Sequence, residues 1–92
     1  MYFDVEEAQY LDGYRLRLRF EDGSTGIADL SGYPDKSNVF RAFLNVEYFK
    51  RFRLEYGTIV WGNGELDIAP ETLYRLATGK SVTYKSTASP AV

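Results

Sequence analysis

The clearest pattern of apolar and polar residues runs from position 14 to position 20, where the two kinds alternate strictly. The apolar and aromatic positions are Tyr14, Leu16, Leu18 and Phe20, and the charged positions between them are Arg15, Arg17 and Arg19. Successive side chains of a β-strand point to opposite sides, so a period of two predicts a strand with one buried face. The three arginines therefore share the other face.

The turn that follows sets how this strand pairs with the next one. Asp22-Gly23 is typical of a two-residue hairpin loop, which predicts a returning strand at residues 25–30. The register that follows from this loop places Leu18 opposite Ile27, Phe20 opposite Thr25 and Leu16 opposite Asp29.

The hairpin before the strand has two possible registers. A two-residue loop at Asp12-Gly13 would bring Glu7 onto the buried face. A three-residue loop at positions 12–14 instead places Ala8 opposite Leu18, Tyr10 opposite Leu16, and Glu7 beside Arg19. Because the buried face specifies register, we favour the three-residue loop. The result is an antiparallel three-stranded meander over residues 2–30.

Helical periodicity begins after a loop at residues 31–35. Ser37 or Asn38 can cap a helix, and Gly57 can end one. Between them the apolar positions at helical spacing are Val39, Phe40, Phe43, Leu44, Val46, Phe49 and Phe52. We therefore predict a central helical segment, divided at Asn45.

A second hairpin and a final helix complete the pattern. Strands at residues 58–61 and 65–68 are joined through Asn63-Gly64, which places Trp61 opposite Leu66 and Ile59 opposite Ile68. A proline at position 70 suits the first turn of a helix, which we expect to begin at position 69 or 70 and to end at Gly79.

These elements predict an α+β fold: a three-stranded antiparallel meander, a central helix, a β-hairpin and a C-terminal helix. We expect one domain over residues 1–80 and a flexible tail over residues 81–92, in which Val82 and Tyr84 could add a short edge strand. The residues expected to be mostly buried are Leu16, Leu18, Phe20, Ile27, Phe40, Phe49, Ile59, Trp61, Ile68 and Leu73.

The amino-acid composition excludes or disfavours several classes of function. The chain has neither cysteine nor histidine, which excludes disulfides, thiolate nucleophiles and the Ser-His-Asp and Cys-His triads. The net charge of −2 argues against a dedicated nucleic-acid-binding protein. The acidic N-terminus has no apolar signal region and no apolar run reaches membrane-spanning length, so we expect a cytoplasmic protein without membrane contact.

The arginines of the alternating strand are the first candidate site. Arg15, Arg17 and Arg19 recur about 6.6 Å apart, a spacing that could follow nucleic-acid phosphates. The alternative is a solvated strand face balanced by acids such as Glu7 on the neighbouring strand. We favour the solvated face because the chain is acidic.

The carboxylates are a second candidate. Asp29 falls on the apolar face in the predicted register, where it either caps the amides of Ser31 and Gly32 or acts as a ligand with a raised pKa. Asp67 and Glu71 lie four residues apart, and with Asp29 they could bind Mg²⁺ or Ca²⁺. We favour capping for all three, and expect no metal and no cofactor.

Trp61 and Tyr74 are expected to lie in opposite environments, the core and the surface. Trp61, at a strand end, is expected to be a core residue rather than a stacking platform for a ligand. Tyr74, on the final helix, is expected to present its hydroxyl at the surface and is an interaction candidate, together with Arg15, Arg17, Arg19, Asp67 and Glu71.

The ordered set of motifs resembles the bacterial family named domain of unknown function 2442. The matching segments cover roughly residues 5–75 and read LRLRFEDG at 16–23, GIADL at 26–30, VF at 39–40, F at 49, IVW at 59–61 and DIAPETLY at 67–74. The family often has proline where this chain has Gly62, and it tends to keep a shorter connection between the Asn-Gly turn and Asp67. Both differences concern turn shape.

The resemblance implies a small α+β domain of the bacterial cytoplasm with no established activity. Some members of the family carry an added helix-turn-helix domain, and others are encoded beside a second small protein in arrangements similar to toxin–antitoxin pairs. If the family is regulatory, we expect this chain to be the partner-binding or sensing half alone.

Three hypotheses of function remain open from the sequence. The first is a non-enzymatic protein-binding or regulatory module, including the antitoxin-like half of a two-protein system, with another protein or a second copy of the chain as partner. The second is a nucleic-acid-binding module that uses the arginines. The third is a small carboxylate- or metal-dependent enzyme. We favour the first and expect no nucleic-acid partner.

Overall fold

The described part of the chain forms two three-stranded antiparallel sheets, each with its strands in chain order. The computed structural model describes residues 3–79. The first sheet is formed by β1 (Val5–Asp12), β2 (Arg15–Phe20) and β3 (Thr25–Asp29), and the second by β4 (Arg53–Glu55), β5 (Thr58–Trp61) and β6 (Leu66–Ile68). The predicted α+β class, with its meander, hairpin and C-terminal helix, is confirmed.

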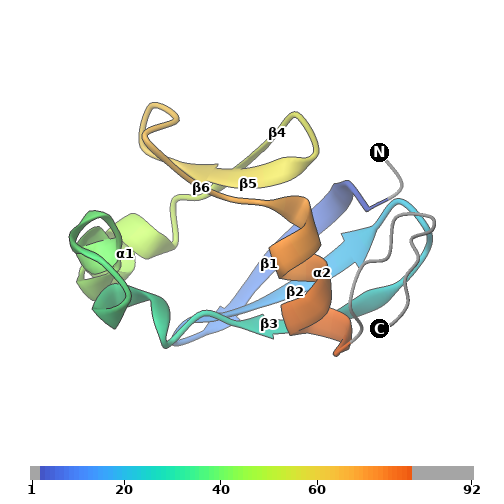
Figure 1. Ribbon diagram of the computed structural model, residues 1–92, viewed down its shortest axis with the longest axis horizontal. Helices are drawn as coiled ribbons and strands as arrows, with labels where there is room; N and C mark the ends of the chain where they lie inside the picture. Colours follow the sequence, from blue (N-terminus) through green and yellow to red (C-terminus); the bar gives the residue numbers. More distant parts are fainter. Residues whose placement is uncertain (1–2, 80–92) are drawn as a thin grey trace, which may run out of the picture.

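The helices join and close the two sheets. Two 3₁₀-helices, η1 (Tyr33–Asp35) and η2 (Asn38–Leu44), and one turn of α-helix, α1 (Val46–Phe49), connect β3 to β4. The longer α2 (Pro70–Thr78) follows β6. Figure 1 shows the short helices gathered at one end of the molecule, while α2 descends from the second sheet across β2 and β3.

The predicted central helix is only partly correct. Asn45 does divide it: this residue ends η2, and its side chain accepts hydrogen bonds from the amides of Glu47 and Tyr48 at the start of α1. The expected continuation to Gly57 is wrong, because residues 53–55 form β4 and pair with β5. Pairing with a neighbouring strand therefore overrides helical periodicity there.

The register of β1 on β2 is as predicted, although its loop differs. Ala8 pairs with Leu18 and Tyr10 with Leu16. The expected three-residue loop is shortened by a register shift between Tyr10 and Asp12, and a second shift lies between Val5 and Glu7. Such irregularities place an extra residue of one strand opposite a single residue of its partner.

The predicted register of β2 on β3 is wrong by one residue. Gly23, at φ +90°, donates its amide hydrogen to the carbonyl of Phe20, and Phe20 in turn donates to Ser24. The loop is therefore the three-residue form with a left-handed glycine rather than the two-residue form. A one-residue slip exchanges the two faces of a strand.

The slip moves two predicted residues of β3 out of the core. Ile27 was expected to be buried and is instead 39% exposed, while Ala28 is fully buried. Asp29 was expected on the apolar face and lies on the outer face opposite Arg15. Its carboxylate accepts a hydrogen bond from the amide of Ser31 at 2.9 Å, so the expected capping role is confirmed.

The second hairpin has the predicted register. Trp61 pairs with Leu66 and Ile59 pairs with Ile68. The indole of Trp61 is fully buried and packs against Phe43 and Phe49, whose ring centroids lie 4.6 and 5.8 Å away, which confirms Trp61 as a core residue.

One core joins the two sheets, η2, α1 and α2. Of the residues predicted to be buried, Ile27 is the exception, and Phe40 is half-buried against the core. Buried as predicted are Leu16, Leu18, Phe20, Phe49, Ile59, Trp61, Ile68 and Leu73. The predicted tail, with Val82 and Tyr84, lies outside the described residues.

Helix α2 packs closely against the first sheet at a glycine of β3. A Cβ atom at Gly26 of β3 would overlap the backbone carbonyl of Ala77 in α2. Only glycine permits an approach this close.

Candidate functional site: the outer face of the first sheet

The face of the first sheet that points away from the core carries all three arginines of β2; we call it the arginine face. Arg15, Arg17 and Arg19 alternate with the buried residues Leu16 and Leu18, as the sequence pattern predicts. Directly opposite them on β1 lie Asp12, Gln9 and Glu7, and on β3 lie Asp29, Ile27 and Thr25.

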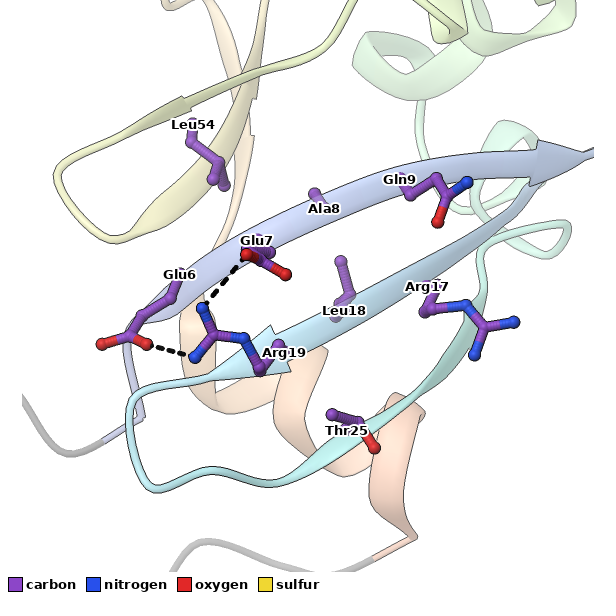
Figure 2. Close-up of a pocket in the computed structure, with 9 residues that line it drawn as sticks. All are labelled: Glu6, Glu7, Ala8, Gln9, Arg17, Leu18, Arg19, Thr25 and Leu54. Atoms are coloured by element: carbon purple, nitrogen blue, oxygen red, sulfur yellow. Dashed lines mark hydrogen bonds and ion pairs between the residues drawn. The ribbon is translucent and has the colours of Figure 1, made fainter.

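Arg19 is paired with two carboxylates. Its guanidinium contacts Glu6 at 2.6 Å and Glu7 at 3.2 Å. Two successive residues of β1 reach the same arginine because the register shifts between Val5 and Glu7. Figure 2 shows both contacts at one end of the face. The hydrogen bond and charge of Arg19 lower the pKa of Glu7.

Arg15 is also paired with an acid that a register shift brings to it. Its Nε and Nη2 atoms donate to the two carboxylate oxygens of Asp12 at 2.9 and 3.0 Å. This bidentate contact is the strong geometry for arginine with a carboxylate. It lowers the pKa of Asp12 and raises the pKa of Arg15. The negative charge of Asp29 on β3 also raises the pKa of Arg15, by a weaker effect.

Arg17 differs from both neighbours. The residues opposite it, Gln9 and Ile27, are uncharged, and no carboxylate within residues 3–79 forms an ion pair with it. Its side chain lines a depression of about 410 Å³. Figure 2 shows Arg17 extending from β2 below Gln9, with Leu54 of β4 on the far side of β1.

The depression combines polar and apolar walls. Its lining residues are Glu6, Glu7, Ala8, Gln9, Arg17, Leu18, Arg19, Thr25 and Leu54. Leu54 is 39% exposed, as is Ile27 beside Arg17. Sequence reasoning missed Leu54 because its strand was predicted as helix, and missed the exposure of Ile27 because of the register error.

The alternative of a carboxylate cluster, which the sequence left open, is not found within residues 3–79. Asp67 is exposed on β6 opposite Val60, and Glu71 lies in the first turn of α2. Asp29 lies on the arginine face. Within the described part of the chain, no group of three or more acidic residues is arranged to hold a metal ion.

Tyr74 lies inside the domain and is only 6% exposed. Its ring contacts Phe3 and Phe20 edge-on, at centroid distances of 4.7 and 5.1 Å. The hydroxyl donates to the carboxylate of Asp22 at 3.0 Å. Instead of being presented to solvent, the hydroxyl therefore fixes α2 to the β2–β3 loop.

A second, shallower depression of about 350 Å³ lies at the helical end and is lined by Val39, Ala42, Tyr48, Glu65 and Leu66. Val39 and Ala42 share one face of η2, because residues three apart align on a 3₁₀-helix. Burial, and then the nearby carboxylate of Glu65, raise the pKa of Tyr48. The sequence motifs gave no signal for this depression.

The model of the family described as "Protein of unknown function (DUF2442)" matches residues 5–79, which span every strand and α2. The chain belongs to the DUF2442 family. No curated protein and no solved structure matches this DUF2442 chain. Within residues 3–79, no helix has the length and apolar character needed to cross a bilayer.

Proposed function

We propose that this DUF2442 chain is a cytoplasmic, non-enzymatic protein-binding module whose contact surface is the depression at Arg17 on the arginine face. The observation that supports the proposal is the contrast between Arg17 and its neighbours. Arg15 and Arg19 are paired with carboxylates of β1, whereas Arg17 lies in a depression without an acidic partner among residues 3–79.

The surroundings of Arg17 suit a protein partner. A guanidinium can bind a carboxylate through two parallel hydrogen bonds, and the Gln9 amide and Thr25 hydroxyl offer further hydrogen-bonding groups beside it. Ile27 and Leu54 add exposed apolar surface. An arginine among apolar groups is a common centre of protein interfaces. We therefore expect an acidic side chain of the partner, flanked by apolar residues, at Arg17.

The same geometry disfavours the nucleic-acid hypothesis. The arginine face carries four carboxylates, those of Glu6, Glu7, Asp12 and Asp29, beside its three arginines. Phosphate binding depends on an excess of cations, and here two of the three arginines are already neutralised. The enzymatic hypothesis lacks support of its own, since Asp29, Asp67 and Glu71 do not come together.

A matched pair of variants tests the proposal. The tagged chain is expressed in its native host as wild type, Arg17→Gln and Arg15→Gln, and copurifying proteins are compared at equal yield. We expect Arg17→Gln to reduce recovery of one specific protein at least tenfold and Arg15→Gln to leave it unchanged. Equal thermal unfolding midpoints establish that both variants fold. A partner that both variants retain in full would refute the role of Arg17.

A regulatory role in a two-protein system can be tested separately from protein binding in general. If the chain is one half of a two-protein system, the protein lost from Arg17→Gln should be encoded by the neighbouring reading frame, and the two purified chains should form a complex of fixed stoichiometry. If the copurifying protein is encoded elsewhere, the hypothesis of a protein-binding module stands and the hypothesis of a two-protein system is refuted.

A further inference from the structure

The turn between β4 and β5 contains a residue whose side chain does not pack in the core of the domain. Glu55 pairs with Thr58, so the connection consists only of Tyr56 and Gly57. Both have positive φ angles, +53° and +79°. Two left-handed residues in a two-residue loop are the mark of a type I′ turn, whose first position favours asparagine, aspartate or glycine.

Tyrosine is an unfavourable choice at that position. Within residues 3–79, Tyr56 is the only residue other than glycine with a positive φ. The left-handed region brings the Cβ atom of a bulky residue too close to its own backbone, and such residues persist where a function requires them.

Nothing within the described domain compensates for this strain. Tyr56 is 98% exposed, and its side chain makes no hydrogen bond or aromatic contact within residues 3–79. The other tyrosines of the described domain are at least partly sheltered from solvent. An aromatic ring held wholly in water at a strained position stabilises neither the core nor the turn.

The turn itself is firmly held. The amide of Val5 donates to the carbonyl oxygen of Gly57 at 2.8 Å, which ties the turn to the start of β1. On the adjoining strand, Arg53 donates to the carboxylate of Glu55 at 3.0 Å. The ring of Tyr56 is thus presented from an ordered backbone, and this reduces the entropy lost when a partner binds it.

We propose that Tyr56 is a partner-contact residue, whose ring inserts into an apolar pocket on the surface of another protein. This inference rests on the proposed protein-binding function but not on Arg17. Tyrosine is enriched at the energetic centres of interfaces because it combines a large apolar ring with a polar hydroxyl.

The charges around the turn indicate the chemistry of the partner. The carboxyl group of Asp4 faces Gly57, so this acidic residue lies beside the turn. Glu55 is the second acidic residue, and Arg53 is the cation paired with it. The pocket that receives Tyr56 is therefore rimmed by lysine or arginine, since complementary charge steers association.

Site-specific cross-linking in the native host tests the proposal. The chain is expressed with the photoreactive residue p-benzoylphenylalanine at position 56, and in a parallel culture at position 39, where Val39 is an exposed apolar residue at the helical end. We expect one adduct at position 56 that is absent at position 39. Its cross-linked peptide should contain apolar residues together with lysine or arginine. An adduct with a second copy of this chain, or with an acidic peptide, would overturn the proposal.

Affinity and stability measurements on the purified cross-linked protein complete the test. We expect Tyr56→Asn to weaken its binding at least tenfold in calorimetry, and Val39→Asn to leave it unchanged. Tyr56→Asn should also raise the thermal unfolding midpoint, because asparagine suits a type I′ turn. A lowered midpoint, or unchanged affinity, would show that Tyr56 is not kept for contact.

The two proposals can fail separately. If Arg17→Gln abolishes binding and Tyr56→Asn does not, the binding module stands and the role of Tyr56 is refuted. If no protein is captured by the wild-type chain or cross-linked at position 56, both proposals fail.

Discussion

The indole Nε1 of Trp61 donates a hydrogen bond of 2.8 Å to the backbone carbonyl oxygen of Phe49. This bond joins the end of β5 to the last residue of α1, and the two aromatic rings stack on each other beside it. Trp61 therefore satisfies a buried carbonyl as well as filling the core. Leaving such a carbonyl without a donor is expected to be costly.

Truncation of Trp61 should destabilise the domain strongly. Trp61→Ala is expected to lower the free energy of unfolding by about 3–5 kcal/mol, because it leaves a cavity in the core beside Phe43 and Phe49. Trp61→Phe retains an aromatic ring but removes the donor to Phe49, with an expected loss of about 1–3 kcal/mol. Chemical denaturation measures both. A loss below about 1 kcal/mol for Trp61→Ala would contradict a core role.

Packing of α2 on β3 should make Gly26 intolerant of any side chain. Gly26→Ala is expected to cost about 1–3 kcal/mol, because the added Cβ meets the backbone of Ala77, which cannot rotate away. Gly32→Ala is the matched control, since a Cβ there meets nothing and the backbone is right-handed. Equal unfolding free energies for the two variants would show that α2 can shift without cost.

The arginine face should not bind nucleic acid. We expect no measurable affinity of the unmodified chain for DNA or RNA at physiological salt, and an intact fold when Arg15, Arg17 and Arg19 are all replaced by Gln, since exposed ion pairs contribute little each. Gel-shift and salt-titration experiments measure the affinity. Micromolar binding that the triple variant abolishes, with the salt slope reduced by about 0.9 per lost phosphate contact, would instead favour a nucleic-acid module.

Acid should weaken the pairing of β1 with β2. The pKa values of Glu7 and Asp12 are lowered by their arginine partners. A carboxylate with a lowered pKa in the folded state contributes stability above its unfolded pKa, and this contribution disappears as the pH falls through the folded pKa. The affected range therefore lies below the ordinary values of 4.5 for Glu7 and 3.8 for Asp12.

The double variant Glu7→Gln, Asp12→Asn tests this pH dependence. Its thermal unfolding midpoint should fall less than that of the wild type between neutral pH and acid. The difference should shrink at high salt, because both ion pairs are exposed. Identical acid profiles for the two proteins at low salt would contradict a stabilising role for these ion pairs.

The register of β1 on β2 could be predicted from sequence because the buried face of this pair has only one good match. Placing Ala8 opposite Leu18 keeps the apolar residues together and fixes the register. The β2–β3 loop could not be resolved in the same way. Asp22-Gly23 fits both a two-residue loop and a three-residue loop with a left-handed glycine, and the two loops expose opposite faces of β3.

The candidate site was partly visible in the sequence. Strict alternation identified the arginine face, and Glu7 was correctly expected beside Arg19, but the contacts of Glu6 with Arg19 and of Asp12 with Arg15 depend on two register shifts in β1. Such shifts leave no signature in a pattern of apolar and polar positions. Tyr56 was hidden for a different reason, because its turn begins with a residue that type I′ turns disfavour.

The order of the strands has a consequence for how the chain folds. Within residues 3–79, every ladder joins strands that are neighbours in sequence, so the loops that must close are short and both meanders can form early. The contact of Tyr74 with Asp22, by contrast, spans 52 positions. Docking of α2 is therefore expected to be the last step of folding. During synthesis the hydrophobic core stays open until the ribosome has added Leu73 and Tyr74.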